Sequence, residues 1–491
     1  MESTTLDSSL RAALDFLQRS PLVRYAELRF VDESTERLRV RDGRPEQVTA
    51  TRTRGVGVRV LGERTWGFAC TAALDEASVV LAARRALAVA QASGRAAFAK
   101  VSWPAQPAAI GRYETKVEID PFTVPIADRL ADLDRPVRAL LGSGKPVQSA
   151  EAWMEWTRLD KRLVSTEGTD TRQKFTYGSC GMHVIAVGDD GTAQRRSYPW
   201  EGGDGFQGGY EHVHALDLMA NVDRIRDEAV ALLTAPPCPE GARALILDSS
   251  QMALQIHESC GHPTELDRVM GTEISLAGGS FLQPDLRGKL AYGSKIVNLV
   301  ADATREGGMG TFGWDDEGVS AGTHALVRDG RFVDYLSSRE TAHTLSRAST
   351  GTMRADGWNR PPLIRMVNVS LEPRADGPGG TLDALIADTR DGVLMATDKS
   401  WSIDDLRLNF QFSCEIAWEI KGGKRTRILR DPLYTGITPQ FWRACDAICS
   451  QDEWRLWGVT TCGKGDPMQL MQVGHGAAPA RFQGVTMGSS T

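Results

Sequence analysis

The segment at residues 257–262, His-Glu-Ser-Cys-Gly-His, places two imidazoles and a carboxylate within six consecutive residues. Neutral histidines are good zinc ligands, and a glutamate beside the first of them can take a proton from a metal-bound water. The spacing is HExxxH, one residue longer than the HExxH of many metalloproteases. His257, Glu258 and His262 therefore form a candidate metal site.

A regular helix would not bring these two rings together. Residues five apart differ by about 140° around a helix axis, whereas residues four apart differ by about 40°. The backbone must therefore widen into a π-like bulge or leave the helix before His262. Pro263 favours the second arrangement, because the residue before a proline is pushed away from the α region. Gly261 supplies the flexibility that such a distortion needs.

A catalytic zinc generally takes three protein ligands and leaves its fourth position to water, so a third ligand must come from elsewhere. Cys462 is the favoured candidate, because its glycine-rich loop lets a thiolate approach closely and Lys464 would help the thiol to ionise. Cys260 lies between the histidines, on a tether too short to complete an open site easily. The other candidates are His324, His343, His475 and Glu265.

Length and composition limit the class of protein. A chain of 491 residues, 41% apolar and 24% charged, is typical of a globular protein of two or three domains. The net charge of -6, without a basic block, argues against direct nucleic-acid binding. The apolar run at residues 77–92 is short and is interrupted by Arg84-Arg85, so no membrane span is expected. No secretory signal is recognisable, and eight scattered cysteines indicate a reduced, cytoplasmic setting.

Hydrophobic periodicity and turn residues predict an α+β fold. An N-terminal α/β-mixed domain, residues 1–236, is expected before a β-rich C-terminal catalytic domain, residues 237–491, which carries the metal-binding helix. The boundary is placed at the proline-rich residues 235–239, with a possible subdivision near residues 103–112. Helices are expected at 10–17, 75–93, 124–141 and 214–233, strands at 25–40, 55–60, 244–247 and 408–420, and hairpins at 183–198 and 325–336.

The wider sequence resembles the TldD/PmbA family of zinc metalloproteases, and the similarity extends through most of the chain. The order and separation of the matching blocks are more specific than any one block. The blocks are residues 55–60, 66–69, 257–262, 315–318, 365–368 and 462–465. The chain departs from the family's usual pattern at Pro263 and at residues 465–469, and neither departure removes a candidate ligand.

That resemblance implies that His257, His262 and Cys462 bind zinc and that Glu258 is the general base. The chain is then expected to be a zinc-dependent peptidase that hydrolyses short or unfolded peptides in an enclosed site, with Glu258 activating a zinc-bound water. Because family members form dimers, a homodimer or a heterodimer with a TldD/PmbA paralogue is also expected. Neither a membrane nor a nucleic acid is an expected partner.

Two other hypotheses stay open from the sequence. An HExxxH peptidase can use a downstream glutamate as its third zinc ligand in place of Cys462. A non-catalytic, zinc-containing regulatory or interaction partner is the second hypothesis, because the family is also linked by name to modulation of DNA gyrase. The acidic residues 315–317 either support the site or form a surface loop. Arg365 and Asn368 either bind peptide backbone or satisfy buried strand ends.

Overall fold

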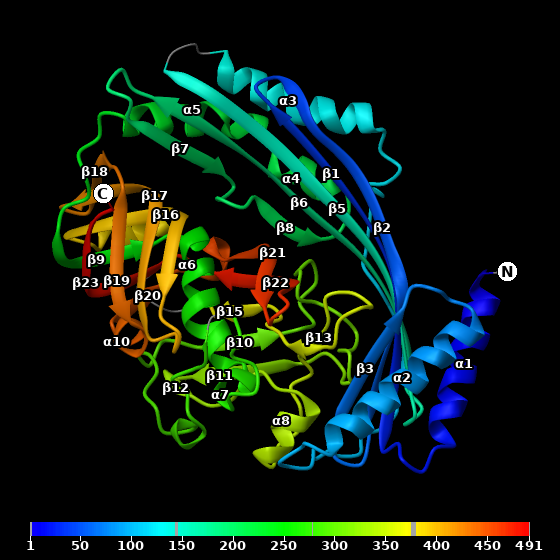
Figure 1. Ribbon diagram of the computed structural model, residues 1–491. Coiled ribbons are helices and arrows are strands. Elements are labelled where there is room, and N and C mark those ends of the chain that lie inside the picture. Colours follow the sequence, from blue (N-terminus) through cyan, green and yellow to red (C-terminus); the bar gives the residue numbers. More distant parts are fainter. Residues whose placement is uncertain (1, 143–145, 277, 375–379, 491) are drawn as a thin grey trace.

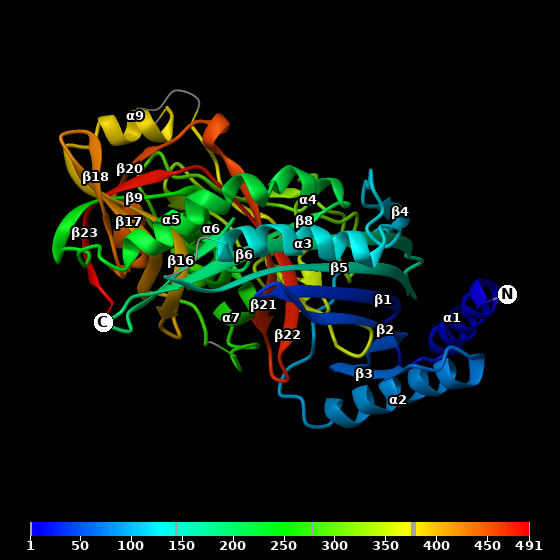
Figure 2. The ribbon, with the colours of Figure 1, turned by 90° about the horizontal axis from the view of Figure 1, so that it is seen from above.

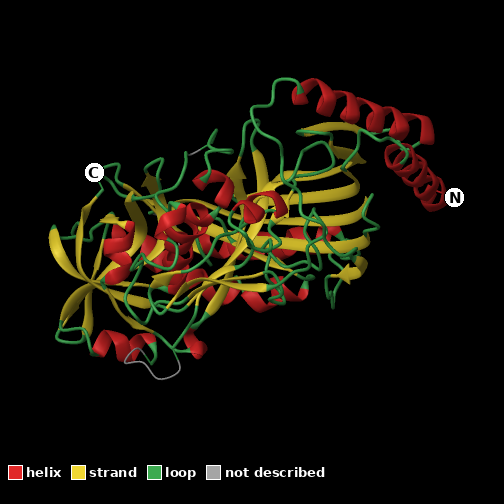
Figure 3. Ribbon diagram, turned by 90° about the horizontal axis from the view of Figure 1, so that it is seen from below, coloured by secondary structure: helices red, strands yellow, loops and turns green. Residues whose placement is uncertain are grey.

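A computed structural model describes residues 2–142, 146–276, 278–374 and 380–490. A large N-terminal sheet of long strands arches over a β-rich C-terminal region, which lies on the concave side of the arch (Figure 1). Strands run through both parts, and the helices of the C-terminal part are short (Figure 3). The α+β fold class expected from the sequence is confirmed.

The arch is built mainly from four long antiparallel strands: β1 (Tyr25–Arg41), β2 (Arg44–Leu61), β5 (Val147–Ser165) and β6 (Asp170–Val187). The strand order is β3-β2-β1-β5-β6-β4, and two further strands pair with β6. Strand β4 runs parallel to β6. The shorter strands of this sheet are β3 (Trp66–Thr71), β4 (Ile110–Glu114), β7 (Ala193–Tyr198) and β8 (Asp204–Gln207).

Helices cover the outer surface and one end of this sheet. α1 (Glu2–Gln18) and α2 (Glu76–Gly94) pack together at the end farthest from the C-terminal strands (Figure 2). α3 (Ile126–Leu141) and α5 (Val222–Leu232) bury apolar side chains against the convex face. Among the described residues, no helix combines the length and the apolar character needed to cross a bilayer.

The continuous helix expected at residues 214–233 is wrong. The chain instead forms α4 (Glu211–Leu216), a 3-10 turn (Met219–Asn221) and then α5. Asp217 interrupts the helix because it adopts a left-handed conformation, with φ 42°. Its carboxylate accepts a hydrogen bond from the amide of Ala220 at 3.1 Å, which starts the next turn.

The C-terminal region is organised around strands that close on themselves. Strand pairing runs β16-β9-β23-β19-β17, and β17 pairs back with β16, so these strands form a closed ring. Closure satisfies the backbone groups that an open sheet edge would leave unpaired. The strands of the ring are β9 (Gly241–Leu247), β16 (Asp391–Ile403), β17 (Asn409–Lys421), β19 (Pro432–Ile437) and β23 (Ala480–Ser489).

The remaining elements surround this ring. The 3-10 turns lie at Pro284–Leu286 and Gln451–Glu453. The helices are α7 (Leu266–Val269), α8 (Arg339–Thr344), α9 (Leu382–Ala387) and α10 (Thr438–Arg443). The strands are β10 (Leu299–Asp302), β11 (Thr323–Arg328), β12 (Arg331–Phe332), β13 (Met353–Arg354), β14 (Leu363–Ile364), β15 (Val369–Leu371), β18 (Lys424–Leu429), β20 (Cys445–Ile448), β21 (Arg455–Lys464) and β22 (Gln469–Ala477).

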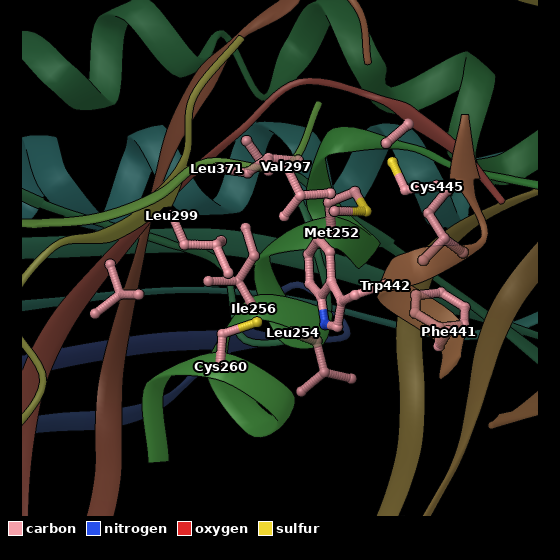
Figure 4. Close-up of a cluster of buried hydrophobic side chains, with 14 of the residues drawn as sticks. Met252, Leu254, Ile256, Cys260, Val297, Leu299, Leu371, Phe441, Trp442 and Cys445 are labelled. Carbon is pink, nitrogen blue, oxygen red and sulfur yellow. The ribbon is translucent and has the colours of Figure 1, made fainter. Parts of the chain in front are cut away.

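Helix α6 (Ser249–Ile256) lies at the centre of the C-terminal region and is buried on nearly every side. Asp248 caps its first turn by accepting a hydrogen bond from the amide of Gln251 at 2.9 Å. Met252, Leu254 and Ile256 belong to the apolar cluster around the indole of Trp442 (Figure 4). This packing anchors the helix that leads into residues 257–262.

The alternating strand expected at residues 408–420 is present as β17, but only its first residues alternate between buried and exposed. Ser413 and Glu415, which alternate with the apolar residues of this strand, are only 1% and 2% exposed. Glu415 is buried because Arg195, Arg196 and Ser197 of β7 surround its carboxylate. The strand is therefore covered on both faces by an element that is distant in sequence.

Candidate metal centre

The residues after α6 form a π-helical turn at His257–Gly261, followed by a 3-10 turn at His262–Thr264. The amide of His262 donates to the carbonyl of His257, five residues earlier, which places both side chains on one side of the chain. The expected departure from the helix before Pro263 is wrong, since His262 keeps the right-handed helical conformation. The alternative expectation, a π-like widening, describes the backbone.

Gly261 allows close packing rather than an unusual backbone conformation. Its φ is −64°, which any residue can adopt. A Cβ atom at this position would lie 1.9 Å from the sulfur of Met366, so a side chain cannot fit without moving that residue. The glycine therefore brings the π turn against the neighbouring segment.

His257, His262 and Cys462 converge, with one potential ligand atom from each lying within 4.8 Å of the others. The Sγ of Cys462 lies 3.8 Å from Nε2 of His262, although the two residues are 200 positions apart. A tetrahedral zinc with Zn–N near 2.05 Å and Zn–S near 2.3 Å separates nitrogen and sulfur by about 3.6 Å. All three side chains are buried, and their spacing fits a metal of this size.

The orientation of His257 is set by a relay through His475. Nδ1 of His475 lies 3.0 Å from the carbonyl oxygen of Val369, which can only accept, so this nitrogen carries the proton. Nε2 of His475 then accepts from Nδ1 of His257 at 2.7 Å. Burial lowers the pKa of His475 well below its ordinary value, consistent with a neutral ring. Nε2 of His257 is thereby left as the atom with a free lone pair.

His262 is oriented by the carboxylate of Glu265. Nδ1 of His262 donates to Oε2 of Glu265 at 3.0 Å, which leaves Nε2 directed toward Cys462. Burial alone would raise the pKa of Glu265, but Lys464, Arg268 and His262 together hold it well below its ordinary value. A charged carboxylate behind a histidine fixes the ring and increases its basicity as a ligand. Glu265 therefore supports His262 from the side opposite the convergence point.

Cys462 sits where a thiolate is favoured. Burial tends to raise the pKa of its thiol, but His262 and Arg365 lower it below the ordinary value. Arg365 also donates to the carbonyl oxygens of Cys462 and Gln469, which holds the β21–β22 hairpin in place. Lys464 does not have the expected role, because its ammonium contacts Asp267 at 2.8 Å and the carbonyl of Ile364 at 2.7 Å.

Glu258 points into the same space and is held by a cation. Its Oε2 accepts a hydrogen bond from Nη1 of Arg407 at 2.7 Å. Arg407 adopts a left-handed conformation, with φ 62°, at the turn before β17. A strained non-glycine residue of this kind persists only where the surroundings enforce it. No feature of the local sequence indicated Arg407, because both its conformation and its partner depend on the tertiary fold.

A cavity of about 640 Å³ opens beside the convergence point. His257, Glu258, His262 and Cys462 line one part of it. A volume of this size is typical of sites for small molecules or short segments of chain. The remaining wall is formed by Trp200, Glu201, Gly202, Gly203, Leu254, Leu276, Asp398, Trp401, Arg407, Gly458, Val459, Thr460, Thr461, Gly463, Met468 and Leu470.

The other ligands considered from the sequence lie elsewhere or act indirectly. The thiol of Cys260 faces away, within 3.2 Å of the hydroxyl of Tyr292. His343 is exposed on α8, and His324 is partly exposed on β11. Within the described part of the chain, the group able to hold a metal consists of two histidines and one cysteine.

The acidic residues 315–317 and Asn368 have structural roles. The residues at 315–317 are not an acidic surface loop, because all three are buried. Asp316 pairs with Lys161 at 2.7 Å and Glu317 with Arg59 at 3.0 Å, which joins the C-terminal region to the N-terminal sheet. Asn368 bonds to backbone and side-chain groups of nearby loops and so does not face the cavity.

Comparison with known proteins places the chain in a family. Models of PmbA/TldA metallopeptidases match residues 26–90 (domain 1), 119–235 (central domain) and 240–489 (C-terminal domain). A metalloprotease of Methanocaldococcus jannaschii is 27% identical over 457 residues, covering 93% of this chain and 95% of that protein. A zinc metalloprotease TldD homologue of Saccharolobus solfataricus is 23% identical over 251 residues, covering 50% of this chain and 52% of that protein.

Solved structures share the fold across the whole chain. A Thermotoga maritima protein described as a modulator of a DNA gyrase superposes with a TM-score of 0.77 at 14% identity. The superposition covers 98% of this chain and 100% of that protein. TldE from Thermococcus kodakarensis superposes with a TM-score of 0.72 at 14% identity, covering 98% of this chain and 99% of that protein. These structures show the shared fold, and the family models, which match most of the chain, show that it belongs to the TldD/PmbA family of metallopeptidases.

Proposed function

We propose that this protein is a zinc-dependent peptidase that hydrolyses short or unfolded peptides. The observation that carries the proposal is the convergence of two imidazole nitrogens and one thiolate at a cavity that also contains Glu258. Family membership and the names of the relatives support the metallopeptidase class. The residues at the convergence point support the two finer parts of the proposal, zinc as the metal and Glu258 as the general base.

The donor set suits zinc. His257, His262 and Cys462 would hold the ion, with two neutral imidazoles and one thiolate as ligands. When bound, zinc supplies the Lewis acidity that polarises a water molecule and the substrate carbonyl. Three protein ligands leave one coordination position open, as catalytic rather than structural sites require. The geometry favours Cys462 over a glutamate as third ligand, because Glu265 contacts the far nitrogen of His262.

Glu258 would move the protons of the reaction. Its carboxylate accepts a proton from the attacking water and returns that proton to the leaving amine as the peptide C–N bond breaks. The charge-assisted bond from Arg407 holds one carboxylate oxygen and so directs the other toward the cavity. Arg407 is thus proposed as a positioning residue for Glu258.

The cavity also supports the substrate class. Its volume of about 640 Å³ accommodates a short extended segment and excludes a folded domain. A dimer, either of two copies or with a paralogue, stays a prediction that light scattering on the purified protein would test. A single species of twice the 53.5 kDa chain mass would support the homodimer.

The decisive test is Glu258→Gln in the full-length protein. Glutamine keeps the shape and can still accept the hydrogen bond from Arg407, but it cannot take up the proton. We expect one equivalent of zinc to be retained and cleavage of an unfolded-peptide pool to fall by about 10²–10⁴-fold. Exposed Glu63→Gln is the matched control and should leave both properties unchanged.

Two outcomes would reject the proposal. Full peptidase activity in Glu258→Gln would remove Glu258 as the general base. A wild-type protein that binds zinc but cleaves no peptide in the pool would favour the non-catalytic role, in which zinc only stabilises an interaction partner.

A further inference from the structure

The cavity beside the metal centre contains a second carboxylate that the proposed chemistry does not use. Asp398 lines this cavity and is only 4% exposed. Within the described residues, no hydrogen-bond donor reaches its Oδ1. Buried polar side chains are nearly always paired in native proteins, and each exception requires an explanation.

The backbone around Asp398 is irregular. Thr397 has a φ of 61°, a left-handed conformation that is unfavourable for a β-branched residue. The pairing of β16 with β17 shifts register immediately afterwards, between Asp398 and Ser400. A bulge of this kind redirects a side chain that would otherwise follow the regular alternation of the strand. The strain at Thr397 therefore coincides with the placement of Asp398 in the cavity wall.

Cations near Asp398 already have carboxylate partners. Arg195 lies 3.0 Å from both Glu201 and Glu415, and it joins these two acids. The adjacent Lys399 turns away and contacts Asp431 at 2.9 Å. Asp398 is thus left beside an ion-pair group whose positive charge is fully matched.

Glu201 faces the same cavity. Its side chain is 34% exposed, and it contributes a second carboxylate to this part of the wall. Within the cavity lining, the guanidinium of Arg407 is bound to Glu258. Among the described residues that line the cavity, the end formed by Asp398 and Glu201 therefore presents two carboxyl groups and no cation without a carboxylate partner.

We propose that Asp398, assisted by Glu201, binds a cationic group of the peptide substrate. The group is either the free α-ammonium or the side chain of lysine or arginine. The inference deepens the proposed peptidase function by naming the charge of the substrate. A cation at this position would provide the partner that the protein itself does not supply.

The titration of Asp398 agrees with this assignment. Burial, together with Glu201 and Glu415, raises the pKa of Asp398 to about 8, whereas Arg195 lowers it only in part. The free protein therefore holds a proton on this carboxyl at neutral pH, and a bound cation would replace that proton. Affinity for a cationic peptide should rise as the pH approaches about 8.

The apolar part of the cavity suits a long cationic side chain. Trp200, Trp401 and Met468 line the same cavity, and Trp401 is 52% exposed. The methylene stem of lysine or arginine packs well on such surfaces while its charged end reaches a carboxylate. An α-ammonium would instead bring the peptide backbone close to the acids.

The test measures binding with cleavage suppressed. Zinc-loaded protein carrying Glu258→Gln is titrated with four fluorescent peptides that combine a free or acetylated amino terminus with lysine or norleucine at one position. We expect the peptides with a cation to bind about tenfold or more tightly than the neutral peptide. Adding Asp398→Asn should abolish that difference, and adding Glu201→Gln should reduce it.

The peptide set identifies the source of the charge. Loss of affinity on acetylation assigns the α-ammonium, and loss on the change from lysine to norleucine assigns the side chain. Raising the pH above about 8 should weaken only α-ammonium binding, since lysine titrates near about 10.4. Exposed Asp452→Asn is the matched control and should behave like the parent protein.

Several results would overturn the inference. Equal affinity for all four peptides would exclude Asp398 as the cation site. Discrimination that persists in Asp398→Asn, with a thermal unfolding midpoint no lower than that of the parent protein, would exclude it as well. Cleavage of neutral and cationic peptides at equal kcat/KM by the protein without the Glu258 change would contradict the inference and leave the peptidase proposal intact. Asp398-dependent binding of cationic peptides, with no cleavage by the protein that retains Glu258, would support the cation site and contradict the peptidase proposal.

Discussion

The metal centre and the junction formed by residues 315–317 both bury charged side chains, but the arrangement of charge differs. At the junction, Asp316 and Glu317 each meet a cation of the N-terminal sheet, so the charges pair across two parts of the molecule. At the metal centre, potential ligand atoms of His257, His262 and Cys462 face one another. Burial alone therefore does not identify a functional site, whereas unpaired atoms that converge on one point do.

Replacing Cys462 with alanine should give the largest effect. It removes the thiolate from the convergence point, so zinc should fall from one equivalent toward none, and cleavage should decrease by about 10³-fold or more. Metal analysis measures the zinc content, and the peptide assay measures cleavage. Cys70→Ala, outside the centre, is the control and should retain zinc. Full zinc content in Cys462→Ala would show that the third ligand lies elsewhere.

Breaking the junction should affect stability without affecting the metal. Asp316→Asn leaves Lys161 buried without its partner, and we expect a loss of about 3–5 kcal/mol in the free energy of unfolding. Burial raises the pKa of Asp316, but Lys161 and Arg29 more than offset this and lower it below its ordinary value. Its stabilisation is therefore present above about pH 4 and is lost as the pH falls through the folded-state pKa.

Denaturant unfolding at pH 7 and zinc analysis would separate the two effects of Asp316→Asn. Exposed Asp189→Asn is the control and should unfold like the wild type. Loss of zinc from a folded Asp316→Asn protein would show that the junction and the metal centre are coupled and not independent.

Removing the relay behind His257 should give a smaller change. His475→Phe fills similar space but cannot accept the proton of His257 Nδ1, so the ring loses its preferred orientation. Zinc affinity should weaken by about 10–100-fold, which competition with a chelator would measure. His343→Phe, on an exposed helix, should bind zinc like the wild type. Unchanged affinity in His475→Phe would remove His475 from the zinc-supporting set.

Asp398→Asn should act in the opposite direction, because it should raise the stability of the protein, by an amount that depends on pH. The raised pKa, about 8, means that the folded state resists ionisation of Asp398, so the wild type loses stability as the pH rises from about 4 toward 8. The asparagine variant avoids this loss, so its stability relative to the wild type should increase steadily between pH 5 and pH 9. Thermal unfolding at both pH values tests this, and equal stability at pH 9 would indicate that Asp398 already has a partner.

Local features of the fold were predictable where short-range chemistry controls them. The turn at Asp329-Gly330 joins β11 and β12 with positive φ values of 49° and 72°, as expected for a tight hairpin. The HExxxH spacing required a distorted helix, and a π turn is present. The helix expected at residues 214–233 was wrong because the left-handed conformation of Asp217 was not recognisable from hydrophobic periodicity.

The site was only partly predictable. Cys462 was favoured as the third ligand from its glycine-rich loop, and the structure brings it to the histidines. His475, a candidate ligand from the sequence, instead supports His257. Arg407 and Asp398 were not identified, because isolated charged residues in a strand-rich segment have no distinctive pattern. The division at residues 236 and 237 stays a prediction.

The amino-acid sequence by itself determined the residue types available for zinc chemistry, the need for a widened turn between the two histidines, and the family. These follow from spacing along the chain, which local backbone geometry converts directly into structure. Only the tertiary structure decided which nitrogen of each histidine is free, which cation holds Glu258, and which buried carboxylate is left without a partner. Those properties depend on hydrogen bonds and charges between segments that are far apart in the sequence, as in the pairs His257–His475 and His262–Cys462, which are 218 and 200 positions apart.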